Sequence, residues 1–79
     1  MFTTVISLNS IEKVKGFVNI MTKQIFDADL VSSRYVIDAK SIMGIFSLDL
    51  SKPIELRVHT EDGTAFDTFK EAIKDYIVE

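Results

Sequence analysis

Hydrophobic residues recur every three or four positions between residues 10 and 25. This spacing matches the turn of an α-helix and places the hydrophobic side chains on one face. Asn9 stands before the run, and Glu12 follows three residues later, a spacing typical of a capping box. The sequence therefore predicts an amphipathic helix over residues 10–25. The residues expected on its buried face are Ile11, Val14, Val18, Met21 and Ile25, with Phe17 beside them.

Three further segments have the composition of β-strands. Residues 3–8 are rich in β-branched side chains, and residues 27–39 hold two short apolar runs around a polar turn at residues 32–34. Hydrophobic and polar residues alternate strictly over residues 54–59, which predicts a half-buried strand that begins after Pro53. The residues of this strand expected to face the core are Ile54, Leu56 and Val58.

Two more helices complete the pattern. Ser41 stands before a short apolar run and is a favourable N-cap, so a short helix is expected to follow it. Thr64 is the expected cap of the last helix. The predicted order β-α-β-β-α-β-α favours an α+β fold, with an antiparallel sheet whose apolar face is covered by the helices. The residues on the expected buried face of the last helix are Phe66, Phe69, Ile73, Tyr76 and Ile77.

Composition and charge exclude several classes of site. The chain has 79 residues, no cysteine, one histidine and a formal net charge of −3, and its length predicts one domain over residues 1–79. The acidic balance argues against a nucleic-acid-binding protein, which normally carries a basic face. Without cysteine, and with His59 as the single histidine, we expect no disulfide, no metal site and no cofactor.

The sequence also bears on location. No apolar run reaches the roughly 18 residues that indicate a membrane helix. The first ten residues, MFTTVISLNS, lack the basic start of a signal peptide. We therefore expect a cytoplasmic protein without membrane insertion.

Two segments resemble a known family. KSIMGIFSL, residues 40–48, is similar to the start of the second helix of HPr proteins, and FDAD, residues 26–29, is similar to the family's sequence at the end of the first helix. HPr proteins are the small histidine-containing phosphocarriers of the bacterial sugar phosphotransferase system. The resemblance implies an HPr-like open-faced β-sandwich, with a four-stranded antiparallel sheet in the order 1-4-2-3 and three helices on one face.

In that family, a histidine at the start of the first helix accepts a phosphoryl group from enzyme I. An arginine two residues later and the helix N-terminus neutralise the phosphate. Counted back from FDAD without gaps, Glu12 occupies the histidine position, Val14 the arginine position and Lys15 a position where proline is usual. No histidine occurs in residues 1–58. The resemblance therefore implies a divergent member that lacks the phosphoryl-accepting histidine.

The charged residues near this position have alternative interpretations. Glu12 is either a fixed charge that mimics a phosphorylated carrier, or a carboxylate that closes the capping box and interacts favourably with the helix dipole. We favour the second, because a carboxylate carries about one negative charge and a phosphoryl group nearly two. Lys13, Lys15 and Lys23 are expected on a solvated helix face. His59 is expected to be an exposed strand residue, at the opposite end of the molecule from the start of the first helix.

The short helix carries the remaining candidates. Ser41 occupies the position that a dedicated kinase phosphorylates in relatives from low-GC Gram-positive bacteria; the alternative is a plain N-cap worth about 1 kcal/mol. In the family, this helix and the start of the first helix form the shared docking surface. The resemblance therefore implies partner-binding roles for Ile42, Met43 and Phe46, and the alternative for each is packing in the core.

Together, these patterns predict a non-catalytic protein-interaction or regulatory module. The alternative is a phosphotransferase-system component that is regulated by phosphorylation of Ser41 in carbon catabolite control. The expected partners are proteins, namely phosphotransferase-system proteins, a serine kinase or a transcription regulator, and the oligomeric state is left open. We do not expect an enzyme, because the sequence shows no nucleophile–base pair, metal cluster or glycine-rich phosphate loop.

Overall fold

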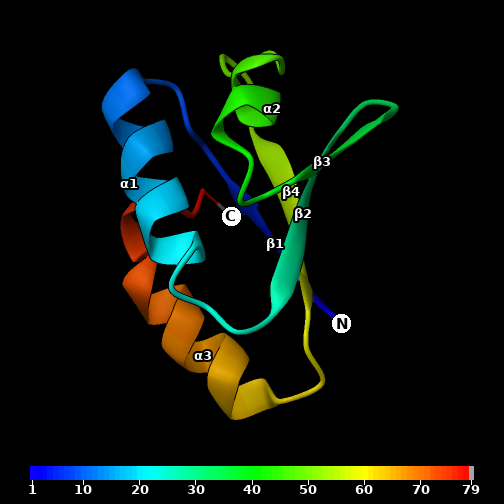
Figure 1. Cartoon of the computed structure of the whole chain (residues 1–79), viewed down its shortest axis with the longest axis vertical. Coiled ribbons are helices and arrows are strands. Elements are labelled where there is room, and N and C mark those ends of the chain that lie inside the picture. The colour runs from blue at the N-terminus through cyan, green and yellow to red at the C-terminus, as the bar shows by residue number, and fades with distance from the viewer. Residues whose placement is uncertain (79) are drawn as a thin grey trace.

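The computed structural model describes residues 1–78. Strands and helices follow the predicted order, and the helices lie on one side of a single sheet (Figure 1). No helix in the described part of the chain is long and apolar enough to cross a membrane. The elements are β1 (Phe2–Ile6), α1 (Ile11–Met21), β2 (Asp27–Ser32), β3 (Tyr35–Asp38), α2 (Ile42–Phe46), β4 (Ile54–His59), α3 (Gly63–Ala72) and a short 3₁₀ helix, η1 (Lys74–Tyr76).

The four strands form one antiparallel sheet in the order β1-β4-β2-β3. β4 lies between β1 and β2, and its Leu56 pairs with Thr4 on one side and with Leu30 on the other. The β2–β3 hairpin is closed by a two-residue turn and extends beyond the body of the molecule (Figure 1). The predicted α+β fold and the sheet order 1-4-2-3 are confirmed.

The hydrophobic core fills the space between the helices and the inner face of the sheet. The alternation predicted for β4 is confirmed, because Ile54, Leu56 and Val58 are all buried. Phe69 of α3 packs edge-to-face against Phe26, with 5.3 Å between the ring centroids. The buried residues that the helices contribute are Val14, Phe17 and Met21 from α1, Ile45 from α2, and Phe66 and Phe69 from α3.

The first helix begins differently from the prediction. Ser10 rather than Asn9 is the N-cap, because the Ser10 Oγ accepts the Lys13 backbone N–H at 3.1 Å. The helix therefore starts at Ile11, and Glu12 is its second residue. A capping box needs the carboxylate at the third helical position, so the predicted pairing of Asn9 with Glu12 is wrong.

The first helix also ends earlier than its hydrophobic pattern predicts. Its last residue is Met21, and the backbone N–H groups of Lys23 and Gln24 donate to carbonyls only three residues back, which closes the helix with a tight final turn. Ile25 consequently lies in the connection to β2 and is fully exposed. Ile11 is also exposed, so the prediction that Ile11 and Ile25 lie on the buried face is wrong.

Two other boundaries differ. Asp62 rather than Thr64 caps α3, because the Asp62 Oδ1 accepts the N–H groups of Thr64 at 3.0 Å and Ala65 at 3.2 Å. β1 covers Phe2–Ile6 rather than residues 3–8, because the chain leaves the sheet after Ile6 to reach the start of α1. Both shifts are small and leave the predicted fold unchanged.

The last described residues run along the outer edge of β1. The Ser7 N–H donates to the Tyr76 carbonyl at 2.8 Å, and the Val78 N–H donates to the Val5 carbonyl at 3.0 Å. The edge of β1 is therefore partly covered. The outer edge of β3, in contrast, has no neighbouring strand within residues 1–78.

The hairpin turn contains a strained residue. Ser33 has a positive φ of 54°, unlike any other non-glycine residue in the described chain. This left-handed conformation costs an L-residue about 1–2 kcal/mol, and glycine adopts it freely. We expect Ser33→Gly to raise the free energy of unfolding, measured in urea, by about 0.5–1 kcal/mol. The matched change Arg34→Gly, at a position without a positive φ, should lower it; a loss of stability in Ser33→Gly would contradict the expectation.

Candidate functional site

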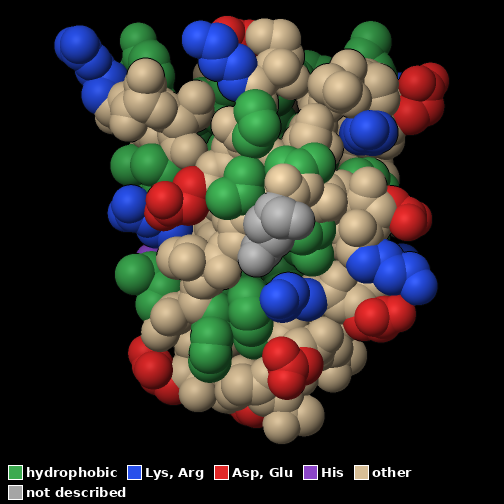
Figure 2. Space-filling view, turned by 180° about the vertical axis from the view of Figure 1, so that it is seen from behind, with side chains coloured by type: hydrophobic (Ala, Val, Ile, Leu, Met, Phe, Trp, Pro, Cys, Tyr) green, Lys and Arg blue, Asp and Glu red, His purple; other side chains and the backbone are tan. Residues whose placement is uncertain are grey.

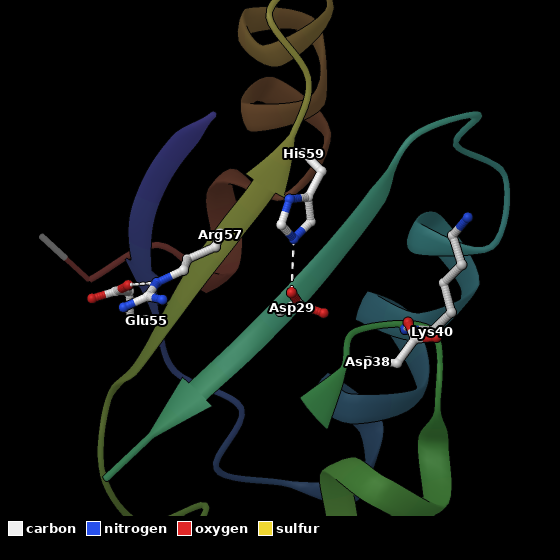
Figure 3. Close-up of polar contacts among 6 residues, drawn as sticks. All are labelled: Asp29, Asp38, Lys40, Glu55, Arg57 and His59. Atoms are coloured by element: carbon white, nitrogen blue, oxygen red, sulfur yellow. Dashed lines mark hydrogen bonds and ion pairs between the residues drawn. The ribbon is translucent and has the colours of Figure 1, made fainter. Parts of the chain in front are cut away.

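α2 and the start of α1 lie at the same end of the molecule, the upper end in Figure 1. The segment that leads into α2 is held by backbone hydrogen bonds: the Ala39 N–H donates to the Ala28 carbonyl at 2.9 Å, and the Ser41 N–H donates to the Asp38 carbonyl at 2.9 Å. The Asp38 carboxylate also accepts the Lys40 N–H at 2.9 Å (Figure 3). These contacts fix where β3 ends and where α2 begins.

α2 is a single short helix that packs closely on β3. Its N-cap is Ser41, as predicted, and the Ser41 Oγ accepts the Gly44 N–H at 3.2 Å. Gly44 faces β3, where a Cβ atom would collide with the Ile37 side chain and crowd the Ser41 hydroxyl. The absence of a side chain at Gly44 therefore lets α2 approach the sheet.

The side chains of α2 divide into a buried side and an exposed side. Ile45 is fully buried, and Ile42 is partly buried against the core. Met43 is 77% exposed and Phe46 is 41% exposed. The helix is thus anchored by Ile45 while it presents two large hydrophobic side chains to solvent.

Ile11 adds a third exposed hydrophobic side chain at this end, because it lies in the first turn of α1 and is 59% exposed. We refer to Ile11, Ile42, Met43 and Phe46 together as the α1/α2 surface. From behind, hydrophobic side chains reach the exterior at this end among charged ones (Figure 2). Sequence reasoning placed Ile11 in the core. Its helical spacing does not distinguish it from the buried Val14, so the spacing contained no signal that this first residue of α1 is exposed.

The charged residues in α1 and just after it form no ion pairs among residues 1–78. Glu12 is exposed and forms no ion pair with another residue among 1–78. As a second-position carboxylate it still interacts favourably with the helix dipole. Lys15 and Lys23 are exposed, and Lys13 is partly exposed, in keeping with a solvated face. Val14, at the position where the resemblance implies an arginine in the family, is completely buried and part of the core.

His59 lies at the other end of the molecule. Val58 pairs with Phe2, so the end of β4 lies beside the start of β1, whereas α1 follows the end of β1. The His59 Nε2 is 2.7 Å from the Asp29 Oδ2 on the open face of the sheet (Figure 3). The register therefore places His59 far along the sheet from the start of α1, as the sequence predicts.

The open face of the sheet carries a row of polar side chains. One row across the four strands contains Thr3, Arg57, Asp29 and Asp38, and Arg57 pairs with Glu55 of its own strand (Figure 3). Within residues 1–78, no group of three or more His, Asp and Glu side chains is placed to hold a metal ion.

A hollow of about 670 Å³ lies between the α1–β2 and β4–α3 connections. Exposed Ile25 stands at this hollow beside Phe26, and His59 and Thr60 contribute to its lining. It belongs to the His59 end of the molecule and is therefore separate from the α1/α2 surface.

Asp49 follows α2 and has a perturbed carboxyl group. Its Oδ1 accepts the Ser51 hydroxyl at 2.6 Å and the Ser51 N–H at 3.1 Å, and these bonds, with a smaller contribution from Lys52, lower the pKa of Asp49. A lowered folded-state pKa means that the stabilisation is present above the unfolded pKa, about 3.9, and is lost as the pH falls through the folded value.

We therefore expect an NMR titration of the Asp49 carboxyl group to have its midpoint below the value of about 3.9 that is usual for aspartate. Ser51→Ala removes the hydroxyl, the largest cause of the shift, and should move the midpoint back upward. A midpoint that is the same in both proteins would show that the Ser51 hydroxyl does not cause the shift.

Comparison with known proteins identifies the fold. No protein-family model matches the sequence, and no curated protein matches it. The solved structure of HPr-C-His from Thermoanaerobacter tengcongensis superposes with a TM-score of 0.74 at 22% identity, over 95% of this chain and 93% of that one. Phosphocarrier protein HPr from Bacillus anthracis strain Ames gives a TM-score of 0.70 at 22% identity, over 98% and 96% of the two chains. The chain therefore has an HPr-like fold over nearly its whole length.

Proposed function

We propose that this HPr-like protein is a non-catalytic protein-interaction module that docks partners through the α1/α2 surface. The observation that carries the proposal is the exposure of Met43 and Phe46 on a helix that is fixed from behind by Ile45. Exposed hydrophobic side chains that gather on one small area are typical of interaction sites. Methionine is suited to such a role because its flexible side chain adapts to different partners.

The chemistry at the start of α1 supports a docking role without phosphoryl transfer to histidine. The residues at the helix start are Ser10, Ile11 and Glu12, and none has an imidazole. The single histidine, His59, is at the other end of the sheet and contacts Asp29. A partner that binds the α1/α2 surface would therefore meet no residue capable of the family's reaction.

A phosphorylation assay tests this part of the proposal. After incubation with phosphoenolpyruvate and enzyme I, we expect no acid-labile phosphate on this protein. An HPr protein that carries the histidine, labelled in the same mixture, shows that the enzyme is active. Acid-labile phosphate on this chain would overturn the proposal.

A binding assay tests the surface. Met43→Asp and Phe46→Asp should each reduce recovery of protein partners in a pull-down, because a carboxylate would have to be desolvated in an apolar interface. Ile25→Asp is the matched control, since Ile25 is an exposed isoleucine away from the α1/α2 surface. Circular dichroism checks that all three variants are folded. Equal recovery by the three variants and the wild type would contradict the assignment of the surface.

A second candidate function is regulation by phosphorylation of Ser41, with a serine kinase and a transcription regulator among the partners. It is favoured by the exposure of Ser41 beside Met43, so that a phosphate would change the charge of the docking surface directly. Incubation with the family's serine kinase and ATP should then modify wild type and Ser10→Ala, which lacks the other serine cap, but not Ser41→Ala. Absence of modification in wild type favours the simple interaction module.

A further inference from the structure

The two outer edges of the sheet differ. The edge of β1 is partly covered by the last described residues, because the Val78 N–H donates to the Val5 carbonyl and Ile77 forms an antiparallel β-bridge with Ile6. The edge of β3 has no strand beside it in residues 1–78. Unpaired backbone groups along such an edge can accept a further strand.

The register of the hairpin indicates which groups are free. In an antiparallel hairpin with a two-residue turn, the pair that flanks the turn, here Ser32 and Tyr35, exchanges backbone hydrogen bonds. Bonded pairs alternate along the ladder, so the N–H and carbonyl groups of Val36 and Asp38 point away from β2. The Asp38 carbonyl already accepts one bond from Ser41, whereas no bond to the Val36 groups comes from outside the sheet.

The side chains of this edge are also available. Tyr35 and Val36 are each 60% exposed, and β3 contains no proline or lysine of the kind that protects sheet edges. Arg34 is exposed and forms no ion pair with another described residue. One oxygen of the exposed Asp38 carboxylate accepts the Lys40 backbone N–H, and the second oxygen is available to another donor.

We propose that β3 pairs antiparallel with β3 of a second copy of this chain, centred on Val36, and so joins the two sheets into one. The sequence of the edge, Arg34-Tyr35-Val36-Ile37-Asp38, is complementary to itself in this arrangement. Val36 lies opposite Val36 of the second copy, Tyr35 lies opposite Ile37, and Arg34 lies opposite Asp38. Each of the two pairs of Arg34 with Asp38 joins a positive and a negative side chain, and the other pairs are hydrophobic.

The faces of the sheet agree with this register. Residues opposite each other in an antiparallel pair lie on the same face. Val36 and Asp38 share the open face, where Val31 of β2 already lies beside Val36, and Arg34 lies in the turn directly before β3. Tyr35 and Ile37 share the helix side. A shift by one residue would place Val36 opposite Ile37 and bring side chains from different faces into one pair, so the charges and the faces select the same register.

The expected interface is small. It joins one short strand from each copy and falls below the roughly 1,200–2,000 Å² that stable complexes bury. We therefore expect reversible dimers with a dissociation constant of about 10 µM to 1 mM, weakened by salt because opposite charges meet.

Sedimentation equilibrium and NMR test the proposal with the intact chain. From about 1 µM to 2 mM, a range that extends below and above the expected dissociation constants, the apparent mass should rise from monomer towards dimer. Backbone amide shifts that change with concentration should centre on residues 34–38. A chain that stays monomeric at 2 mM overturns the proposal, even if a different protein pairs with the edge. Concentration-dependent shifts centred on Met43 and Phe46 also overturn it, because they would assign the contact to the α1/α2 surface.

Charge exchange tests the register. Arg34→Asp would place two carboxylates opposite each other, and Asp38→Arg would place two guanidinium groups opposite each other, so each variant alone should dimerise at least about tenfold more weakly. An equimolar mixture of the two variants restores both attractive pairs and should form a heterodimer of near wild-type strength. If both variants are folded by circular dichroism and the mixture remains monomeric, the proposed register is wrong.

Discussion

Ile45→Asp is expected to unfold the protein, whereas Met43→Asp, two residues earlier on the same helix, is expected to leave it folded. Ile45 is fully buried, so an aspartate there would lose the hydrophobic contacts and place a carboxylate without a partner in the core, at a cost of at least about 4 kcal/mol. A chain of 79 residues has a total stability of about 4–12 kcal/mol, so a loss of at least this size removes from about a third to all of it. Met43 is mostly exposed, and its change should stay within about 0.5 kcal/mol of wild type.

Urea unfolding followed by circular dichroism measures both variants. The pair is informative because both substitutions replace a large hydrophobic side chain by the same charge on the same turn of α2, on opposite sides of the helix. Similar losses of stability in both variants would mean that Met43 is part of the core, and the α1/α2 surface would lose its principal residue.

Gly16→Ala is expected to destabilise the protein by about 1–3 kcal/mol, although alanine is the better helix former by about 1 kcal/mol. Gly16 lies within α1, and a Cβ atom there would collide with the hydroxyl group of Tyr76. Tyr76 is held in this position because its carbonyl accepts the Ser7 N–H and its ring packs edge-to-face on Phe17. Urea unfolding again gives the free-energy difference.

Two variants separate the collision from a general effect of alanine. Gly63→Ala makes the same change at the first residue of α3, where the nearest atom, on Phe2, is at an ordinary 3.8 Å, so it should stabilise slightly. Tyr76→Phe removes the hydroxyl, and the double variant with Gly16→Ala should recover most of the loss. If Gly16→Ala is as stable as wild type, the packing of Tyr76 over α1 does not occur.

Sequence patterns were most informative where one side of an element faces the core along its whole length. The strict alternation of β4 located its bounds and its inward residues, because a shift by one residue would have moved Leu56 from the core to solvent. The sheet order required the resemblance to HPr proteins, since periodicity alone does not specify which strands are neighbours.

The ends of elements were less predictable. Ile25 continues the helical spacing of α1, yet the chain has already turned toward β2, and spacing contains no information on where that turn occurs. The sequence also did not indicate which of two adjacent residues is the N-cap of α1. Asn9 and Ser10 are both favourable N-cap residues, and only the bond from the Lys13 N–H to Ser10 in the structure distinguishes them. The position of Tyr76 over Gly16 depends on the path of the C-terminal segment, which no local pattern indicates.

The covered edge of β1 has a practical consequence for attaching labels or a solid support. The Met1 ammonium group pairs with Glu61 at 2.9 Å, in the connection between β4 and α3. The antiparallel bridge of Ile77 with Ile6 and the bond from the Val78 N–H to the Val5 carbonyl direct the last described residues back toward the beginning of β1, away from Met43. A tether fused at either terminus therefore leaves the α1/α2 surface, at the opposite end of the protein, facing the solution and accessible to a binding partner.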